Sequence, residues 1–452
     1  MLCRLSARAP ALSFVVLTLL LGVAQRQAFA QSDASTDVAS IAAAPAVAAP
    51  AVAAAAAAAP QEPPPTADGS GGFFNEPGFL TSAITFANAF GEKAEKPKSG
   101  FYPELSNMIT GSGFVSLGPG YRQYFANDNA FIDTSAALSW RMYKMGQARF
   151  EMPNLANEHL AVGTQFMWQD NTQVNYFGVG PDVNEDARSQ YRMQTHDTVA
   201  YATVTTKEWL TMSGKVGWLG HPKLMNPGGT FLRDFPSTLD AFASDPAAGL
   251  NVQPAFLHSE LSAAADTRDH RGHPTSGGLY RGALTNYSDR TYDSFTFHTW
   301  EAEGLQYVPL ADSRVVLAFH GWTVAGNPAD GNAIPFYMLP AIGGSRTLRD
   351  YHDFQFHDNN LLVAGAESRF AVWEHLDAAL FLDTGNVAAR YRDLNLDKTS
   401  YGAGLRVHTD TTTLARLDFA QGRQGWHVVF STSEPFRLPR VKRTVATVPF
   451  TP

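Results

Sequence analysis

A few histidine side chains in this 452-residue sequence have the spacing needed to share a metal ion. His270 and His273 are spaced to contact one metal ion, and His352 and His357 lie just after the glycine-rich segment at 343–351. Imidazole is a common ligand of transition metals, but histidines in loops are more often solvated or hydrogen-bonded. We therefore predict no metal site and no cofactor.

The sequence lacks the short motifs that mark common catalytic sites. It contains no Gly-x-Ser-x-Gly elbow, no phosphate-binding loop and no His-Glu-x-x-His. We therefore expect that the protein is not an enzyme. The alternative is a hydrolase whose Ser, His and Asp residues come together from distant segments.

The composition excludes several classes of protein. The formal charge is −8, from 34 basic and 42 acidic residues, and no basic block dominates, so we expect no nucleic-acid partner. The single Cys excludes disulfide frameworks and Cys-based zinc sites. The length suits either three small domains or one large all-β domain with tails.

Residues 1–30 have the features of a secretory signal peptide. Arg4 and Arg8 precede an apolar run over 11–24, and the Ala-Phe-Ala of 28–30 supplies a cleavage site. The apolar run is short for a bilayer span. We predict export beyond the inner membrane, and a retained amphipathic anchor is the alternative.

Residues 31–72 are dominated by Ala and Pro, and we predict that they form a disordered linker. The Ala run at 53–59 could suggest a transmembrane helix. However, prolines at 45, 50 and 60 interrupt any helix, and Ala buries too little apolar surface to support a core.

Residues 73–109 form the next segment, which we predict to be short and periplasmic. Four apolar residues recur there at helical spacing, namely Leu80, Ile84, Ala87 and Phe90. This pattern predicts one amphipathic helix near 78–91. The helix could pack in a core, lie against a membrane or plug an opening.

From about residue 110 onwards the sequence alternates with a period of two. In 376–383 the even-numbered side chains are mostly apolar, whereas Asp377 and Asp383 lie on the opposite face. Arg416 and Asp418 likewise share one face of 415–419, and the other face is apolar. Such segments of 8–14 residues, separated by Gly, Pro, Asn and Asp, predict β-strands.

Alternation alone does not say which face points inward, and a soluble barrel or sandwich is the alternative to a membrane barrel. Three features favour the membrane barrel: charges recur on the polar face, no helices cover the other face, and aromatic residues lie near strand ends. These aromatic residues are Trp140, Tyr143, Trp168, Tyr176, Trp218, Trp373 and Trp426. Strands cross hydrocarbon only as a closed barrel. We therefore predict an all-β, transmembrane antiparallel β-barrel of 16 strands over 110–436.

The segment 343–351 contains a recognisable loop signature. Its characteristic residues are Gly343, Gly344, Leu348, Arg349, Asp350 and Tyr351. The segment resembles the loop of the bacterial surface antigen family, a superfamily that includes outer-membrane barrel-assembly proteins and two-partner-secretion transporters. Segments 176–181 and 266–269 resemble turns of the same family. Five segments fit its closing strands: 360–373, 376–388, 400–409, 412–421 and 426–436.

The resemblance implies a loop that folds back into the barrel interior. In the family the Arg of this loop pairs with acidic residues of the next two strands, and the matching residues here are Arg349, Glu367 and Asp383. A guanidinium has a rigid fork of donors that suits carboxylates. The two carboxylates could instead form an acid/base pair, but the Arg favours the ion-pair interpretation.

Asp350 departs from the family, which usually has Gly after the Arg. The backbone at Asp350 must therefore avoid conformations that only Gly tolerates, and the extra carboxylate could compete for Arg349.

The last predicted strand departs from the family at its end. Its insertion signal is predicted at Trp426, Val428, Phe430 and Phe436. Family barrels commonly end at such an aromatic residue, but here a basic tail at 437–452 follows. The tail is either solvated or directed to anionic surfaces.

Family members usually carry polypeptide-transport-associated (POTRA) domains before the barrel, and residues 31–109 leave no room for one. The resemblance implies an outer-membrane protein that translocates or inserts a polypeptide client, or a lipid. Its expected partners are outer-membrane lipids, that client and the barrel-assembly machinery that inserts the protein itself. The alternatives are an outer-membrane lipase or protease on a barrel, and a soluble secreted β protein.

Overall fold

The computed structural model describes residues 72–78, 80–82, 84–85, 99–106, 116–228 and 235–431. The predicted signal peptide, nearly all of the Ala/Pro linker and the basic tail lie outside these residues. The chain divides into two compact units, 1–69 and 70–452, and the described residues belong to the second. None of the helices in the described ranges is both long enough and apolar enough to cross a membrane.

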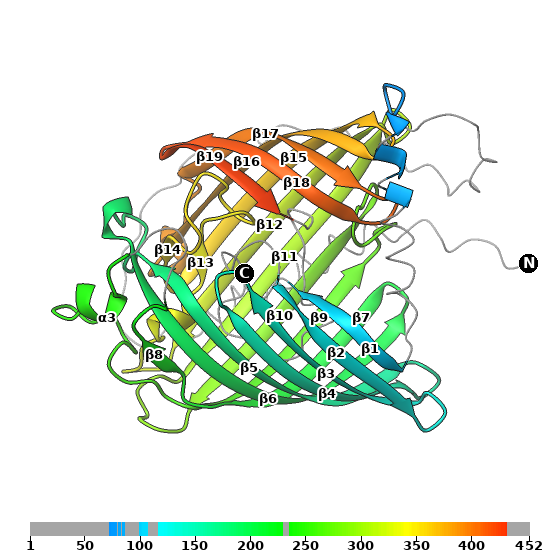
Figure 1. The fold of residues 1–452 in the computed structure, drawn as a ribbon. Helices are drawn as coiled ribbons and strands as arrows, with labels where there is room; N and C mark the ends of the chain where they lie inside the picture. Colours follow the sequence, from blue (N-terminus) through cyan, green and yellow to red (C-terminus); the bar gives the residue numbers. More distant parts are fainter. Residues whose placement is uncertain are drawn as a thin grey trace, which may run out of the picture. The chain divides into compact units, whose positions relative to one another are not determined.

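Sixteen strands of the described chain follow one another in an antiparallel sheet that curves around an interior (Figure 1). The strands are β1 (Gly100–Ser106), β2 (Ser116–Phe125), β3 (Ala130–Ser139), β4 (Lys144–Leu155), β5 (Leu160–Tyr176), β6 (Ser189–Lys207), β7 (Leu210–Leu219), β9 (Phe256–Asp266), β10 (Gly277–Asp289), β11 (Phe297–Leu310), β12 (Val315–Pro328), β15 (Asn360–Trp373), β16 (Leu376–Ala388), β17 (Lys398–His408), β18 (Thr413–Gly422) and β19 (Gly425–Ser431). Each pairs with the next in this order. The predicted all-β class is confirmed.

The remaining elements lie in the connections between these strands. β8 (Lys223–Met225) pairs with β6, and β13 (Ala341–Ile342) pairs with β14 (Phe356–His357) in a separate two-stranded sheet. The named helices are short: α3 (Thr238–Ala241) and the 3-10 turns η1 (Glu185–Ala187), η2 (Phe336–Met338) and η3 (Tyr391–Asp393).

The two ends of the sheet differ in the length of their connections. At one end, which we call the short-turn end, the connections have two to four residues, with the single described exception of 267–276. The opposite, long-loop end carries the connections 177–188, 220–255 and 329–359.

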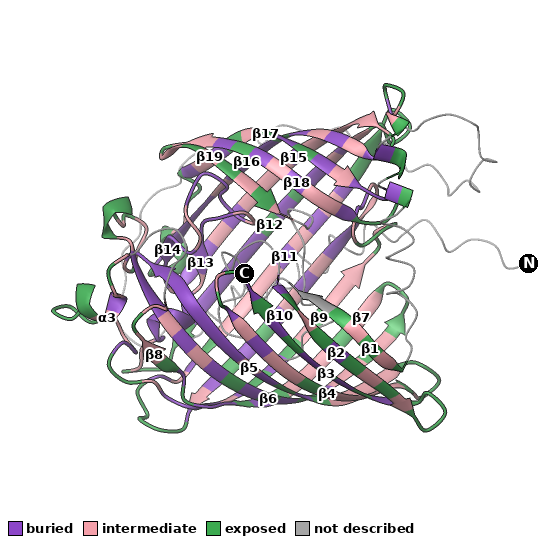
Figure 2. Ribbon diagram, in the orientation of Figure 1, coloured by how far each residue is buried: buried purple, intermediate pink, exposed green. Residues whose placement is uncertain are grey.

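Polar side chains of the strands face the interior and apolar ones face outward. Figure 2 shows buried and exposed residues alternating along the strands. In β16, Asp377 and Asp383 are buried, whereas Leu380 is 57% exposed. In β18, Asp418 is fully buried and Phe419 is 45% exposed. This is the orientation that a barrel in a bilayer requires.

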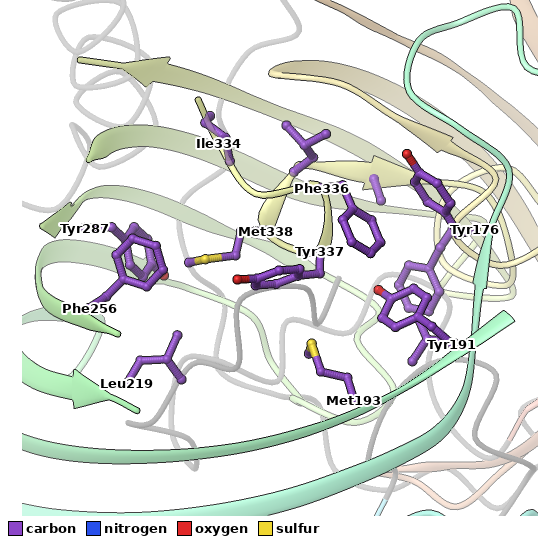
Figure 3. Close-up of a cluster of buried hydrophobic side chains, with 14 of the residues drawn as sticks. Tyr176, Tyr191, Met193, Leu219, Phe256, Tyr287, Ile334, Phe336, Tyr337 and Met338 are labelled. Carbon is purple, nitrogen blue, oxygen red and sulfur yellow. The ribbon is translucent and has the colours of Figure 1, made fainter. Parts of the chain in front are cut away.

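Apolar side chains from the connections fill part of the interior. Phe336, Tyr337 and Met338, in the connection between β12 and β13, pack in one cluster with Tyr176 and Tyr191 (Figure 3). The rings of Tyr176 and Phe336 are 4.7 Å apart. The connection between β12 and β13 therefore adds an apolar core to the interior side of the sheet.

Tyr143 and Tyr176 were predicted to lie at the membrane interface, and that prediction was wrong. Both are 1% exposed and belong to the interior apolar cluster. The Tyr143 hydroxyl donates to the carbonyl oxygen of Gln173 at 2.7 Å. A buried tyrosine whose hydroxyl has a hydrogen-bond partner lies near a strand end, as an interfacial tyrosine does. The position in the sequence therefore does not distinguish the two kinds of tyrosine.

The sheet begins at Gly100, ten residues before the expected start at 110. Strand β1 contains Pro103, which lacks a backbone donor and is tolerated on an edge strand. Within the described residues no register pairs β1 with β19, so β1 has β2 as its neighbour on one side.

The helix predicted near 78–91 is described only in part. Residues 78, 80–82, 84 and 85 are helical, and Leu80 and Ile84 are buried. Ala87 and Phe90 lie outside the described residues.

Candidate functional site

The 343–351 loop turns sharply at two glycines. Gly343 and Gly344 have φ angles of +119° and +89°, which other residues rarely adopt. The backbone nitrogen of Gly344 donates to the carbonyl oxygens of Leu348 and Tyr351, at 3.1 Å each. The loop is therefore closed on itself and presents Arg349 from a fixed turn.

Apolar contacts anchor the loop to the inner face of the sheet. Leu348 and Tyr351 are buried in a cluster with side chains of the surrounding strands. Their neighbours are Trp322, Val324, Ile342, Phe356, Leu361, Val363 and Val387. The backbone nitrogen of Asp350 also donates to Ser400 Oγ of β17, at 3.0 Å. The loop is thus attached to strands on both sides of Arg349.

Arg349 contacts three carboxylates. Its Nη1 lies 3.0 Å from Glu367 Oε2 and 3.4 Å from Asp418 Oδ2, and its Nε lies 3.0 Å from Asp383 Oδ2. Its Cζ lies 3.8 Å from the ring centroid of Phe381. The structure brings together the three residues that the resemblance implied and adds Asp418.

Two further arginines complete the site. Arg406 Nη2 lies 2.8 Å from Glu367 Oε2, and Arg406 Nη1 also contacts Asp418. Arg416 Nη1 lies 3.3 Å from Asp418 Oδ2. We call the whole group the ion cluster: Arg349, Glu367, Asp383, Arg406, Arg416 and Asp418. Its three guanidiniums and three carboxylates cancel in formal charge.

The ion cluster is shielded from solvent, with every member at most 3% exposed. A buried charge loses its hydration and is tolerated only when it is paired and hydrogen-bonded. Each of the three carboxylates contacts at least one guanidinium. This arrangement suits a structural lock on the loop better than an acid/base pair, which needs access to a substrate.

Sequence comparison places the chain in a family. The Omp85 superfamily domain matches residues 128–425, which is 298 of the 452 residues. The chain belongs to the Omp85 superfamily. A comparison with curated protein sequences finds no match. Within the described residues of this Omp85 protein, no POTRA domain precedes β1.

Solved structures resemble this Omp85 protein in fold. BamA from Haemophilus ducreyi, in a form lacking POTRA domains 1–3, has a TM-score of 0.55 at 14% identity, over 78% of each chain. CdiB from Escherichia coli has a TM-score of 0.46 at 11% identity, over 72% of this chain and 59% of its own. CdiB from Acinetobacter baumannii has a TM-score of 0.45 at 11% identity, over 73% of this chain and 58% of its own.

Membership of the Omp85 superfamily supports a general role in polypeptide translocation or insertion. It also points to the bacterial outer membrane, where proteins with this barrel fold are found.

Asp350 is the residue at which this Omp85 protein departs from the family loop, and the structure accommodates both its backbone and its carboxylate. Its φ angle is not positive, so its backbone avoids the Gly-only region as expected. Its carboxylate lies against the β18–β19 turn, where a Cβ atom built on Gly422 would overlap Asp350 Oδ2. Burial raises the pKa of the Asp350 carboxyl to about 6. The loop therefore tolerates this carboxylate because Gly422 leaves room for it.

The predicted insertion signal lies partly on the described chain. Trp426, Val428 and Phe430 of β19 are 70%, 64% and 42% exposed, all on the outer face. Strand β19 ends at Ser431, and Phe436 lies outside the described residues.

Among the described residues, His270, His352 and His357 belong to no group of three or more potential metal ligands. His270 is exposed, whereas His273 is buried. His352 stacks on Phe177, with ring centroids 5.8 Å apart, and His357 is buried, where desolvation lowers its pKa to about 4. His273 stacks on His408 of β17, with ring centroids 3.7 Å apart.

Proposed function

We propose that this protein is a non-enzymatic outer-membrane barrel that inserts or translocates a polypeptide client, with the 343–351 loop held against the inner wall by the ion cluster. The observation that carries the proposal is the position of Arg349, whose guanidinium contacts Glu367, Asp383 and Asp418. A lipid is the alternative client.

The ion cluster supports a conformational role for the loop. It joins the loop to strands β15, β16 and β18 through Arg349, so release of this one side chain would break ion pairs with three strands. A buried site with balanced charges is stable when all of its partners are present, and the loss of one partner costs free energy because it leaves a buried charge uncompensated. A client that displaced the loop would have to offset that cost.

The outer face supports a membrane location. Large apolar side chains, including Leu261, Leu284 and Leu380, are more than half exposed on strands whose inner faces are polar. A soluble secreted protein would lose free energy by exposing such a surface to water. The protein would itself be inserted by the barrel-assembly machinery, with the outward residues of β19 as the signal.

Depletion of the protein tests the proposal. Cells that lack it are compared with cells complemented by the wild-type gene, by Arg349→Ala and by the matched surface variant Arg390→Ala. We measure the outer-membrane proteome and the lipid content. We expect selective loss of client polypeptides, restored by the wild type and by Arg390→Ala but not by Arg349→Ala. A changed lipid content with an unchanged proteome identifies a lipid client, and no change in either contradicts the proposal.

The enzyme alternative has a separate test. The purified barrel is incubated with phospholipid and with peptide substrates. We expect no turnover. Hydrolysis that a single Ser or His substitution abolishes would overturn the non-enzymatic assignment.

A further inference from the structure

The 267–276 connection is the long exception at the short-turn end, and its tip reaches a distant part of the sheet. Gly272 forms an isolated parallel bridge with Thr412, in the turn between β17 and β18. The Thr413 backbone nitrogen donates to the Gly272 carbonyl oxygen at 2.9 Å. The connection starts from β9 and β10, and four strands, β11, β12, β15 and β16, separate β10 from β17. We call this connection the strap.

The strap is too short to follow the wall of the sheet. Five strand spacings of about 4.8 Å give a path of roughly 24 Å along the wall from β10 to β17. Gly272 is five residues away from Gly277, where β10 starts, and five extended residues span at most about 18 Å. The strap therefore runs from one part of the wall to the other by a shorter path than the curve of the sheet.

The tip of the strap contacts side chains that point into the interior. Asp377 lies on the same face of β16 as Asp383, which belongs to the ion cluster. Asp377 Oδ2 lies 3.4 Å from His273 Nε2. Arg369, which is buried on the inner face of β15, donates to the Pro274 carbonyl oxygen. The strap therefore crosses the interior at the short-turn end.

Polar contacts and a ring stack hold His273 at the tip. Arg369 Nη1 lies 3.4 Å from His273 Nδ1, so the ring accepts at Nδ1 and carries its proton on Nε2, toward Asp377. The Thr413 hydroxyl lies 3.1 Å from the same Nδ1 atom. The ring stacks on that of His408 in β17, with centroids 3.7 Å apart and planes 8° apart. His273 is therefore the main side-chain anchor of the tip.

The base of the strap is held by backbone hydrogen bonds that continue the β9–β10 pairing. The Thr267 backbone nitrogen donates to the Gly278 carbonyl oxygen at 2.7 Å, and the Gly278 nitrogen donates to Thr267 Oγ1 at 3.0 Å. The Asp269 carboxylate accepts from the backbone nitrogens of Thr275 and Ser276, at 3.0 and 3.1 Å, which closes the segment on itself. The strap is therefore a compact unit that is firmly attached at its base.

The tip, in contrast, has no apolar core. The strap reads Thr-Arg-Asp-His-Arg-Gly-His-Pro-Thr-Ser, so none of its ten residues, 267–276, has a large aliphatic side chain. Exchange of one protein hydrogen bond for hydrogen bonds to water costs only about 0.5–1.5 kcal/mol. Segments with few buried apolar contacts are the ones that open locally in native proteins. The tip is therefore the end of the strap that detaches more readily.

We propose that the strap is an autoinhibitory barrier, which crosses the short-turn end of the interior and must detach at its tip before a polypeptide client enters from that end. The base stays paired with β9 and β10, so release is a swing of the strap and leaves the wall intact. The inference rests on the function proposed above and adds the step that admits the client.

Removal of the strap tests the barrier in the absence of any client. Residues 268–275 are replaced by Asn-Gly, a dipeptide suited to tight β-turns, and the purified full-length protein is measured in planar bilayers. We expect the single-channel conductance to rise at least twofold over that of the wild type. His270→Ala changes an exposed side chain of the same segment and should conduct like the wild type. Equal conductance with and without the strap overturns the proposal.

A disulfide that locks the tip covers a deletion that fails to fold. Gly272→Cys with Thr412→Cys places cysteines on two bridge partners, in a Cys3→Ser background that removes the single cysteine of the chain. A Cβ atom on Gly272 would lie 2.7 Å from the Thr411 carbonyl oxygen, so Gly272→Cys alone is the control for the substitution itself. Mass spectrometry of the purified protein verifies the cross-link.

The locked variant is then tested in cells that lack the wild-type protein. We expect the cross-linked pair to leave the client polypeptides depleted, whereas the wild type and Gly272→Cys restore them. Restoration of the client by a fully cross-linked pair overturns the proposal. If the wild type itself restores no client, the function proposed above fails, and the conductance comparison still decides whether the strap is a barrier.

Discussion

Arg349 Nη1 lies 3.4 Å from Asp418 Oδ2, although the two residues are 69 positions apart in the chain. The contact joins the inner loop to the second-last strand of the sheet. The sequence predicts ion pairs between Arg349 and the two strands that follow the loop. The structure adds an ion pair with a third strand, β18. The stability of the loop therefore depends on residues that follow it by several strands.

The Arg349→Ala variant tests the lock directly. Removal of the guanidinium takes the arginine contact from Asp383 and leaves one excess negative charge in the buried ion cluster, a loss of about 3–5 kcal/mol. We expect a lower folded yield in heat-modifiability gels, or a higher conductance in planar bilayers. The surface change Arg390→Ala is the control, and wild-type yield and conductance in Arg349→Ala would show that the loop is not held by this residue.

Arg416 and Asp418 form a coupled pair. Each single neutralisation, Arg416→Gln or Asp418→Asn, leaves one excess charge in the buried ion cluster, whereas the double variant restores the balance. We expect the double variant to be more stable than the sum of the single effects by about 1–3 kcal/mol. Chemical unfolding in micelles measures the four free energies of unfolding, and strict additivity would mean that the two charges do not interact.

Gly404 leaves room for the ion cluster. A Cβ atom at this position would overlap Asp418 Oδ1 and lie 2.7 Å from the Leu417 carbonyl oxygen. The backbone contact cannot be relieved by a rotamer change, so Gly404→Ala should lower the free energy of unfolding by about 1–3 kcal/mol. Gly321→Ala is the matched control because nothing lies within 4 Å of its added carbon. Similar stability of the two variants would exclude this steric role.

Asp350 should make loop docking depend on pH. Burial raises the pKa of the Asp350 carboxyl to about 6, above its ordinary value of about 4. The free energy of unfolding is therefore highest below pH 4 and falls as the pH rises through 6, by on the order of 1 kcal/mol after solvent screening. Asp353 acts in the same direction, since burial also raises its pKa to about 6. Limited proteolysis of the loop from pH 4.5 to 7.5 measures the effect.

Matched variants separate the two carboxyls. Asp350→Asn should reduce the fall in loop protection as the pH rises, and the double variant with Asp353→Asn should remove that fall and leave the opposite contribution of buried His357. An unchanged profile in the double variant would assign the pH dependence to other groups.

The outward face of β16 tests the membrane orientation. Leu380→Arg places a charge on an apolar face, which costs about 2–4 kcal/mol near the bilayer centre. Leu396→Arg makes the same change in the exposed connection between β16 and β17, and it should have little effect. Folding into lipid vesicles measures both variants. Equal folding would mean that the outer face of β16 does not contact hydrocarbon.

The alternation of the closing strands predicts much of the fold. The segments predicted at 360–373 and 376–388 are β15 and β16 with the same bounds. These strands have one polar and one apolar face, so the pattern of their own side chains is enough to predict that they are strands and which face points outward. Strand β1 was missed because Pro103 and its short length hide the pattern.

The ion cluster could be predicted only in part. Alternation placed Arg416 and Asp418 on a polar face, but it does not say which inward residues meet across an interior. Arg406 was not singled out for the same reason. The position of the 267–276 connection was also not predicted, because its contacts with β17 and β18 depend on the curvature of the whole sheet and not on any local spacing.

The ion cluster also imposes an order on biogenesis. Arg406 and Asp418 are supplied by strands that follow the 343–351 loop in the chain, and Asp418 contacts all three arginines. A nascent chain that ended before β18 would lack both Arg416 and Asp418, so Arg349 and Arg406 would have only Glu367 and Asp383 as partners. The carboxylate shared by all three arginines is added only with β18, so the loop docked with its full set of ion pairs reports that the wall has been completed to that point.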